Sequence, residues 1–153
     1  MGLKKMEKHE LQNLSDEVMR SFGARLQTEG YVFVKTGEGK IRVLSEEAYR
    51  AAALFRGVMN AGIYVAKQRK NFVTLTIEGC KFVSLLPEAH VVELTKEDAV
   101  KWMRGDPVKV GKQNHKTVIG RYRGHLLGTA LVDINGVAYP QVPKWRRLPP
   151  ETS

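Results

Sequence analysis

The residues with the clearest chemistry in this chain are basic side chains that stand beside aromatic ones. Near the C-terminal end, the stretch Lys144-Trp-Arg-Arg147 places the indole of Trp145 among three cations. Lysine and arginine contact phosphate oxygens, and an aromatic ring offers a face on which a nucleobase can stack. Arg121 and Arg123 alternate around Tyr122, so a strand here would project both arginines to one face. This chemistry suits a polyanionic partner, nucleic acid first.

The positive charge is concentrated in the last third of the chain. The net charge is +9, and residues 101–153 hold ten basic and three acidic residues, which supplies +7 of it. The same segment contains short β-like runs, glycines and aromatics, so we expect it to be a folded surface. A focused positive field on a small folded unit favours polyanions.

The sequence gives little indication of metal binding or catalysis. The four histidines are scattered, and no spacing would aim two imidazoles at one metal. Cys80 lies in an apolar run, which indicates a buried structural thiol. We therefore predict no metal, no cofactor and no catalytic residue. The alternative is a small RNA-acting enzyme that uses His115 or His125 as a general acid or base.

Length and composition are those of an ordinary soluble protein. The 153 residues allow one domain or two small ones, and 42% of them are hydrophobic. A single cysteine excludes an intramolecular disulfide. No apolar run approaches the roughly 20 residues of a membrane helix, and the N-terminus lacks the apolar core of a secretory signal. We expect a cytoplasmic protein without a membrane partner.

Apolar periodicity predicts an N-terminal half that mixes helices and strands. Spacings of three to four over residues 3–28 indicate one helix or two, ended by Gly30. Alternation over 31–35 and 40–44 predicts a hairpin. Ser45 is a good N-cap for a helix that runs to about residue 55.

The middle of the chain is harder to assign. Residues 58–66 suggest a strand, followed by a basic turn over Lys67–Lys70. The next stretch is compatible with a strand or a short buried helix. We favour a helix from about Thr76, ended by Pro87.

The last part of the chain reads as a strand, a helix and then several strands. A strand over 91–94 precedes a helix that Thr95 caps and Gly105 ends, with Trp102 in the core. Further strands are expected near residues 107–110, 117–123, 126–133 and 137–142. Asn135-Gly136 is a strong signal for a two-residue hairpin turn. A domain boundary near residues 87–90 follows from this pattern.

Several short motifs resemble a known RNA-binding family. The stretch Val91–Val108 looks like the opening of a PUA-like domain, a small RNA-binding pseudobarrel. Residues 57–148 resemble the C-terminal RNA-binding region of Sun-family rRNA cytosine-5 methyltransferases. The motifs that carry the resemblance are, in order, Met59–Lys70, Leu94-Thr95, Met103-Arg-Gly105, Tyr122–Gly128, Tyr139-Pro140 and Pro143–Arg147. The last motif departs from the family pattern, because Trp145 replaces a glycine.

The resemblance implies an RNA-binding module without methyltransferase activity. The family's S-adenosylmethionine-binding domain and its catalytic cysteine motifs have no counterpart in this chain. We therefore predict an α+β fold with an N-terminal α+β subdomain over 1–88, a PUA-like domain over 89–148 and a tail over 149–153.

The predicted function is non-catalytic binding of structured RNA, either rRNA or tRNA, in ribosome biogenesis or RNA modification. An RNA-modifying enzyme acting in trans is a further expected partner. A scaffold for protein interactions in an RNA-processing complex is another alternative. The predicted RNA-binding residues are Lys67, Arg69, Lys70, Arg104, Lys112, Arg121, Arg123, Lys144, Trp145, Arg146 and Arg147.

Overall fold

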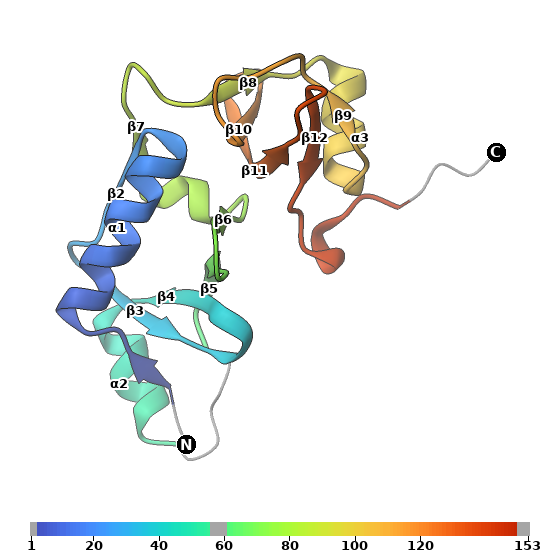
Figure 1. Ribbon diagram of the computed structural model, residues 1–153. Coiled ribbons are helices and arrows are strands. Elements are labelled where there is room, and N and C mark those ends of the chain that lie inside the picture. The colour runs from blue at the N-terminus through green and yellow to red at the C-terminus, as the bar shows by residue number, and fades with distance from the viewer. Residues whose placement is uncertain (1–2, 56–60, 150–153) are drawn as a thin grey trace.

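The computed structural model describes residues 3–55 and 61–149. Its main elements are two five-stranded sheets, one from each half of the chain, with helices packed beside them (Figure 1). The helices are α1 (Lys8–Phe22), α2 (Glu46–Ala53) and α3 (Lys96–Arg104). The predicted α+β class is confirmed.

The N-terminal sheet is built around the predicted hairpin. Its strands are β1 (Lys4–Lys5), β3 (Val32–Lys35), β4 (Lys40–Leu44), β5 (Ile63–Gln68) and β6 (Val73–Leu75), in the order β1-β3-β4-β5-β6. The antiparallel pairing of β3 with β4 confirms the hairpin. Ser45 caps α2 as expected, by accepting a hydrogen bond from the backbone N–H of Ala48.

Helix α1 is shorter than the sequence predicted. Glu7 and Glu10 form a capping box at its start, and Gly23 ends it in the left-handed conformation with φ of +65°. A Cβ on Gly23 would also come within 2.9 Å of the backbone of Ala89, so the chain is closely packed at this point. The prediction that the helical stretch continues to Gly30 is therefore wrong.

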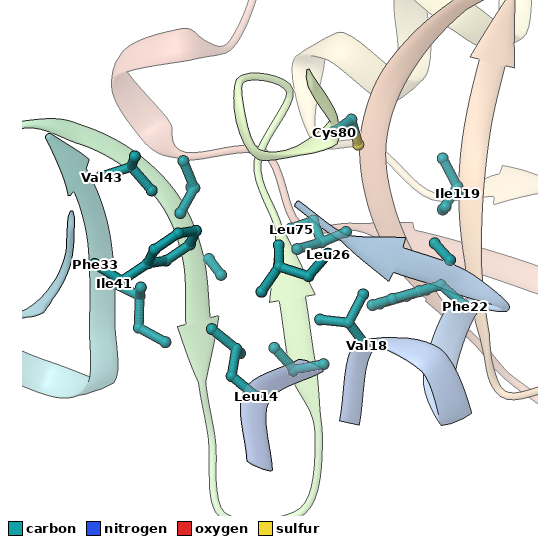
Figure 2. Packing of buried hydrophobic residues seen from close by; sticks show 14 of the residues in the cluster. Leu14, Val18, Phe22, Leu26, Phe33, Ile41, Val43, Leu75, Cys80 and Ile119 are labelled. Carbon is teal, nitrogen blue, oxygen red and sulfur yellow. The ribbon is translucent and has the colours of Figure 1, made fainter. Parts of the chain in front are cut away.

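One apolar face of α1 forms the centre of the main core. Leu14, Val18 and Phe22 recur at every fourth residue and are almost fully buried (Figure 2). They belong to the same cluster as Leu75 of β6 and Ile119, which comes from the C-terminal half. The two halves thus share a core.

The predicted helix from Thr76 is wrong. A single turn of 3₁₀ helix, η2 (Gly79–Phe82), is followed by strand β7 (Val83–Leu85), which pairs with β2 (Ala24–Leu26). The Thr76 hydroxyl accepts a hydrogen bond from the N–H of Gly79, and this local bond holds a turn instead of a helix. The pairing with β2, nearly 60 positions earlier in the chain, gives the following residues their strand conformation.

Strand β5 begins and ends later than predicted. Positions 58–60 of the predicted strand lie outside the described residues, and the strand runs from Ile63 through Lys67 to Gln68. The turn begins only at Arg69, whose N–H donates to the carbonyl of Phe72. Lys67 is therefore a strand residue and not part of a turn.

The C-terminal half follows its sequence pattern closely. The strands β8 (Val91–Glu93), β9 (Val108–Lys109), β10 (Thr117–Tyr122), β11 (His125–Val132) and β12 (Val137–Pro140) form a curled, barrel-like sheet in the order β8-β10-β11-β12-β9. Thr95 caps α3, and Gly105 ends it with φ of +80°. Trp102 is fully buried, as predicted, and its indole N–H donates to the carbonyl of Leu127.

The two hairpin turns of this sheet differ from the predictions. Arg123 and Gly124 both have positive φ and form a two-residue turn between β10 and β11. The Asn135-Gly136 pair belongs to a longer loop, in which the N–H of Asp133 donates to the carbonyl of Val137. Arg123 therefore does not continue the strand, and the prediction that Arg121 and Arg123 share one strand face is wrong.

The predicted boundary near residues 87–90 lies between the two sheets, whose strands span residues 4–75 and 91–140. The division into two domains at this boundary stays a prediction, and the shared core places Ile119 among N-terminal residues. Across residues 3–55 and 61–149, no helix has the length and apolar character needed to cross a membrane.

Candidate nucleic-acid interface

A basic cleft of about 480 Å³ lies where the N-terminal sheet meets the segment over residues 140–147. One wall comes from the β3–β4 turn and from β4, β5 and β6, and the other comes from residues 140–147. Five cations, one acid and two aromatic rings line it. They are Lys40, Lys67, Arg69, Lys144, Arg147, Glu38, Tyr64 and Trp145.

The sheet wall of the cleft is a row of side chains across three strands. Lys40 of β4 lies opposite Lys67 of β5, which in turn lies opposite Thr74 of β6. Directly opposed residues project to the same face of a sheet, and two like charges in that relation are destabilising. An anion bound in the cleft would offset this repulsion.

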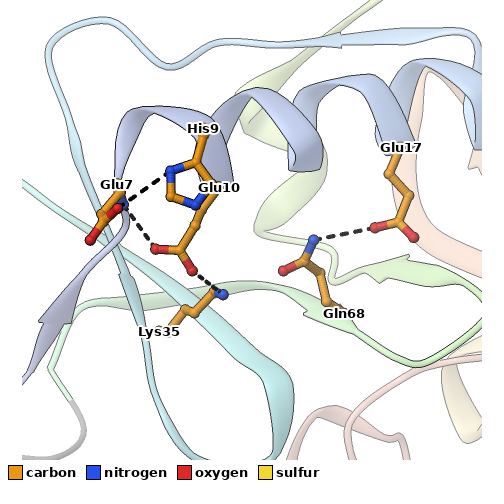
Figure 3. A network of polar contacts seen from close by, with 6 residues as sticks. All are labelled: Glu7, His9, Glu10, Glu17, Lys35 and Gln68. Carbon is orange, nitrogen blue, oxygen red and sulfur yellow. Dashed lines mark hydrogen bonds and ion pairs between the residues drawn. The ribbon is translucent and has the colours of Figure 1, made fainter.

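Gln68, the next residue along β5, projects to the opposite face of the sheet, where it contacts α1. The Gln68 side chain donates to a carboxylate oxygen of Glu17 on α1, 3.3 Å away (Figure 3). In the same network Lys35 is paired with Glu10, and this hydrogen bond is the main reason that the pKa of Glu10 falls to about 2. These two acids of α1 are thus engaged on the helix side of the sheet, and neither lines the cleft.

Tyr64 brings an aromatic ring to the sheet wall. The Nζ of Lys40 lies 5.6 Å from the ring centroid, and the guanidinium carbon of Arg42 lies 5.7 Å from it. Both distances allow cation–π attraction. Burial raises the pKa of the Tyr64 phenol above its ordinary value, although Arg69 and Arg42 act in the opposite direction. The ring therefore stays neutral and adds no negative charge to the cleft.

Trp145 lies on the opposite wall and is 68% exposed. It is the middle residue of the 3₁₀ turn η3 (Lys144–Arg146), which starts directly after Pro143. The N–H of Arg146 donates to the carbonyl of Pro143, 2.8 Å away, and closes the turn. A large exposed indole is thus carried on a well-defined backbone.

The residues after Trp145 tie this wall to the rest of the fold. Arg147 donates from Nε to the carbonyl of Val142, and its guanidinium packs over Gly105 at the end of α3. The N–H of Leu148 donates to the carbonyl of Met103 in α3. These contacts hold the turn that carries Trp145 in place.

Arg146 was predicted to bind RNA together with Lys144 and Arg147, but in the structure it forms an ion pair. Its Nε lies 3.0 Å from a carboxylate oxygen of Glu78, which stands directly before η2 in the N-terminal half. The pair links the end of the chain to the other half of the molecule. Arg146 does not line the cleft.

The described residues that line the cleft carry an excess of positive charge. The ion pairs found in residues 3–55 and 61–149 join other groups, so none of the five cleft cations takes part in one. Glu38 is the single acid in the lining. A concave surface with five cations and one acid attracts anions and raises their local concentration.

The structure brings five of the eleven predicted residues together in the cleft: Lys67, Arg69, Lys144, Trp145 and Arg147. The two basic segments predicted from separate parts of the sequence therefore meet. The remaining six residues lie outside the lining: Lys70, Arg104, Lys112, Arg121, Arg123 and Arg146. Lys70 is exposed next to Arg69, whereas Lys112 is exposed in the loop before β10.

Arg121 and Arg123 are engaged locally. Arg121 forms an ion pair with Glu93, its direct neighbour on the parallel strand β8. The guanidinium of Arg123 lies 5.3 Å from the ring centroid of the adjacent Tyr122. The charge of Arg121 is thus neutralised by an acid, whereas the ring contact leaves the charge of Arg123 in place.

The sequence prediction missed Lys40, Arg42 and Tyr64. Lys40 and Arg42 alternate along β4, a pattern that places both side chains on one strand face. This signal was present in the sequence. The pairing of β4 with β5 places Lys40 opposite Lys67 and Arg42 opposite Tyr64, and the sequence pattern does not specify it. Arg42 contacts the Tyr64 ring without lining the cleft itself.

Two of the four histidines lie against each other. In the described part of the chain, no cluster of three or more His, Cys, Asp or Glu side chains could hold a metal. His90 and His115 stack with ring centroids 3.3 Å apart, and the His90 Nδ1 lies 2.8 Å from the carbonyl of Ser21. The buried Cys80 has its pKa raised to about 12 by burial, so its thiol stays protonated.

Comparison with known proteins does not identify a family. No protein-family model matches the chain, and no curated protein matches it. The resemblance to the RNA-binding region of Sun-family methyltransferases stays a prediction.

Proposed function

We propose that this protein binds structured RNA through the basic cleft, without catalysing a reaction. The observation that supports the proposal most strongly is the meeting of five cations from the two halves of the molecule around one cleft, with a single acid among them. Phosphate groups are the common ligands of such a surface, and RNA adds bases that can contact Tyr64 and Trp145.

The cations act by electrostatic capture of the RNA backbone. Binding of phosphates to lysine and arginine releases counterions from the RNA, which makes affinity fall as the salt concentration rises. The two aromatic rings and the concave shape then select for RNA parts that fit the cleft. Ribosomal RNA and transfer RNA are the proposed targets, and the proposed role is in the cytoplasm, in ribosome biogenesis or RNA modification. A modifying enzyme acting in trans is part of the same proposal.

The experiment that tests this proposal measures the dissociation constant for fluorescent rRNA and tRNA fragments. We expect the affinity to fall at least tenfold between about 50 and 200 mM salt, because several phosphates are contacted. The variant Lys40→Glu/Lys67→Glu should lose most of the binding. DNA of the same sequence serves as a comparison and should bind more weakly.

A matched control reverses two lysines outside the cleft. Lys109→Glu/Lys112→Glu changes the net charge by the same amount at exposed positions that do not line the cleft. We expect this variant to retain affinity within about threefold, since distant surface charges are screened by salt. Equal losses in the two variants, or no salt-dependent binding by the wild type, would contradict the proposal.

A further inference from the structure

We infer that the basic cleft binds a single-stranded segment of RNA and stacks one unpaired base on the indole of Trp145. The inference rests on the proposed function and specifies which form of RNA the cleft accepts. It follows from the exposure of Trp145, the way its backbone is held, and the shape and charge of the cleft.

Trp145 is prepared for stacking before any ligand binds. Its side chain is 68% exposed, whereas Trp102 is fully buried in the C-terminal core. The turn that carries Trp145 is closed by the hydrogen bond to Pro143 and held at its end by Arg147. Because hydrogen bonds already hold the backbone of this turn, a base that stacks on the ring has to order only the Trp145 side chain, which lowers the entropic cost of binding.

The shape of the site favours a base that has left its helix. The cleft encloses about 480 Å³, within the range of about 300–1,000 Å³ typical of small-ligand sites. Within duplex RNA the bases are stacked on one another and their faces are covered, so only a pair at the end of the duplex could lie on Trp145. Single strands and loops expose base faces, and proteins read them by stacking on aromatic side chains.

The cations are arranged to hold the strand on both sides of that base. Lys67 and Arg69 belong to the sheet wall, and Lys144 precedes Trp145 on the opposite wall. Surfaces that bind single-stranded nucleic acid combine such a basic groove with aromatic rings. Phosphates on either side of the stacked base would lie between the two walls and offset the repulsion between Lys40 and Lys67.

The test compares three probes on the full chain: a short oligouridine, an RNA duplex of equal length, and inorganic polyphosphate. Polyphosphate supplies the charge without a base. We expect the oligouridine to bind about tenfold more tightly than the duplex. Trp145→Ala should weaken oligouridine binding about tenfold and change polyphosphate binding less than about twofold, because stacking involves the base alone. Trp145→Phe should recover part of the loss.

Tryptophan fluorescence gives a second readout on the wild-type protein. Since Trp102 is buried, the emission that a soluble quencher can reach belongs to Trp145. Oligouridine should quench this emission and protect it from the soluble quencher, whereas polyphosphate should do neither. The Trp145→Phe variant is the control, and its remaining emission should not respond to either ligand.

Failure of this inference can be distinguished from failure of the proposed function. Equal affinity for duplex and oligouridine, or full affinity in Trp145→Ala, overturns the stacking of an unpaired base. The proposed function survives that result if binding still depends on salt and is lost in Lys40→Glu/Lys67→Glu. If the three probes fail to bind while the rRNA or tRNA fragments bind, this inference alone is wrong. If the fragments do not bind either, both proposals are wrong.

Discussion

The molecule has two basic regions that look alike in the sequence and differ in the structure. The first is the cleft, in which Lys67, Arg69 and Lys144 stand without an ion-pair partner among the described residues. The second is the end of the β10–β11 hairpin, where Arg121 is paired with Glu93 and Arg123 lies over Tyr122. Both combine cations with an aromatic ring.

The difference shows that a basic segment becomes a candidate binding surface only when the fold leaves its charges unpaired and brings several together. At the hairpin end Arg121 is neutralised by Glu93 on the neighbouring strand. The ring contact of Arg123 leaves its charge in place, as the same kind of contact between Arg69 and Phe72 does in the cleft. The cleft gathers cations from strands β4 and β5 and from the end of the chain, and it has one acid among them. The following predictions compare the two regions.

Removing one arginine from each region should have the larger effect in the cleft. We expect Arg147→Ala to weaken RNA binding about tenfold, since it removes a cation and a charge-assisted hydrogen bond that holds the Trp145 turn. Arg123→Ala should change the affinity less than about twofold. Fluorescence anisotropy with one RNA probe measures both. Arg147→Lys, which keeps the charge, should lie between wild type and Arg147→Ala.

Neutralising one acid from each region should give a smaller effect of the opposite sign. Glu38→Gln removes the one acid of the cleft lining and should raise RNA affinity about threefold at low salt. Glu93→Gln releases Arg121 from its ion pair, yet we expect RNA affinity to stay within about twofold, because Arg121 is outside the cleft. A clear gain in Glu93→Gln would show that the hairpin end binds RNA as well.

His90 and His115 are a third group of basic side chains close together, and they predict a small pH effect on stability. Burial is the main cause that lowers the pKa of His90 below its ordinary value, with a contribution from His115. The unfolded chain then takes up the proton first as the pH falls. The stability that neutral His90 contributes is present above about pH 6.5 and is lost as the pH drops through its folded-state pKa.

Urea unfolding at several pH values between about 7.5 and 5.5 measures this effect. We expect the midpoint to decrease on acidification, with a smaller decrease in His90→Asn. An unchanged midpoint in the wild type, or an increase, would contradict the assignment of His90 as a neutral group.

Much of the C-terminal half could be predicted because its signals are local. Thr95 and Gly105 mark the ends of α3 through bonds and backbone angles within a few residues. The error at Thr76 has a different origin. The strand that follows η2 depends on its pairing with β2, a contact between segments far apart in the chain, and no local pattern records it.

The same contrast between local signals and long-range contacts applies to the candidate site. Runs of like charge identified Lys67 and Lys144 from neighbouring residues alone. Lys40 was missed, because its place beside Lys67 depends on strand register. The register between β4 and β5 shifts at an irregularity between Ile41 and Arg42, which alters the pairing beyond it. The two basic segments meet at one cleft only through the tertiary structure, so the sequence pattern could not predict it.

The most direct test of the central claim compares charge reversal in the two basic regions. Lys67→Glu/Arg69→Glu and Arg121→Glu/Arg123→Glu change the net charge equally, and circular dichroism checks that both variants are folded. We predict that RNA affinity falls at least thirtyfold in the cleft variant, about 2 kcal/mol, and less than about threefold in the hairpin variant. Equal losses, or a larger loss in the hairpin variant, would contradict the account.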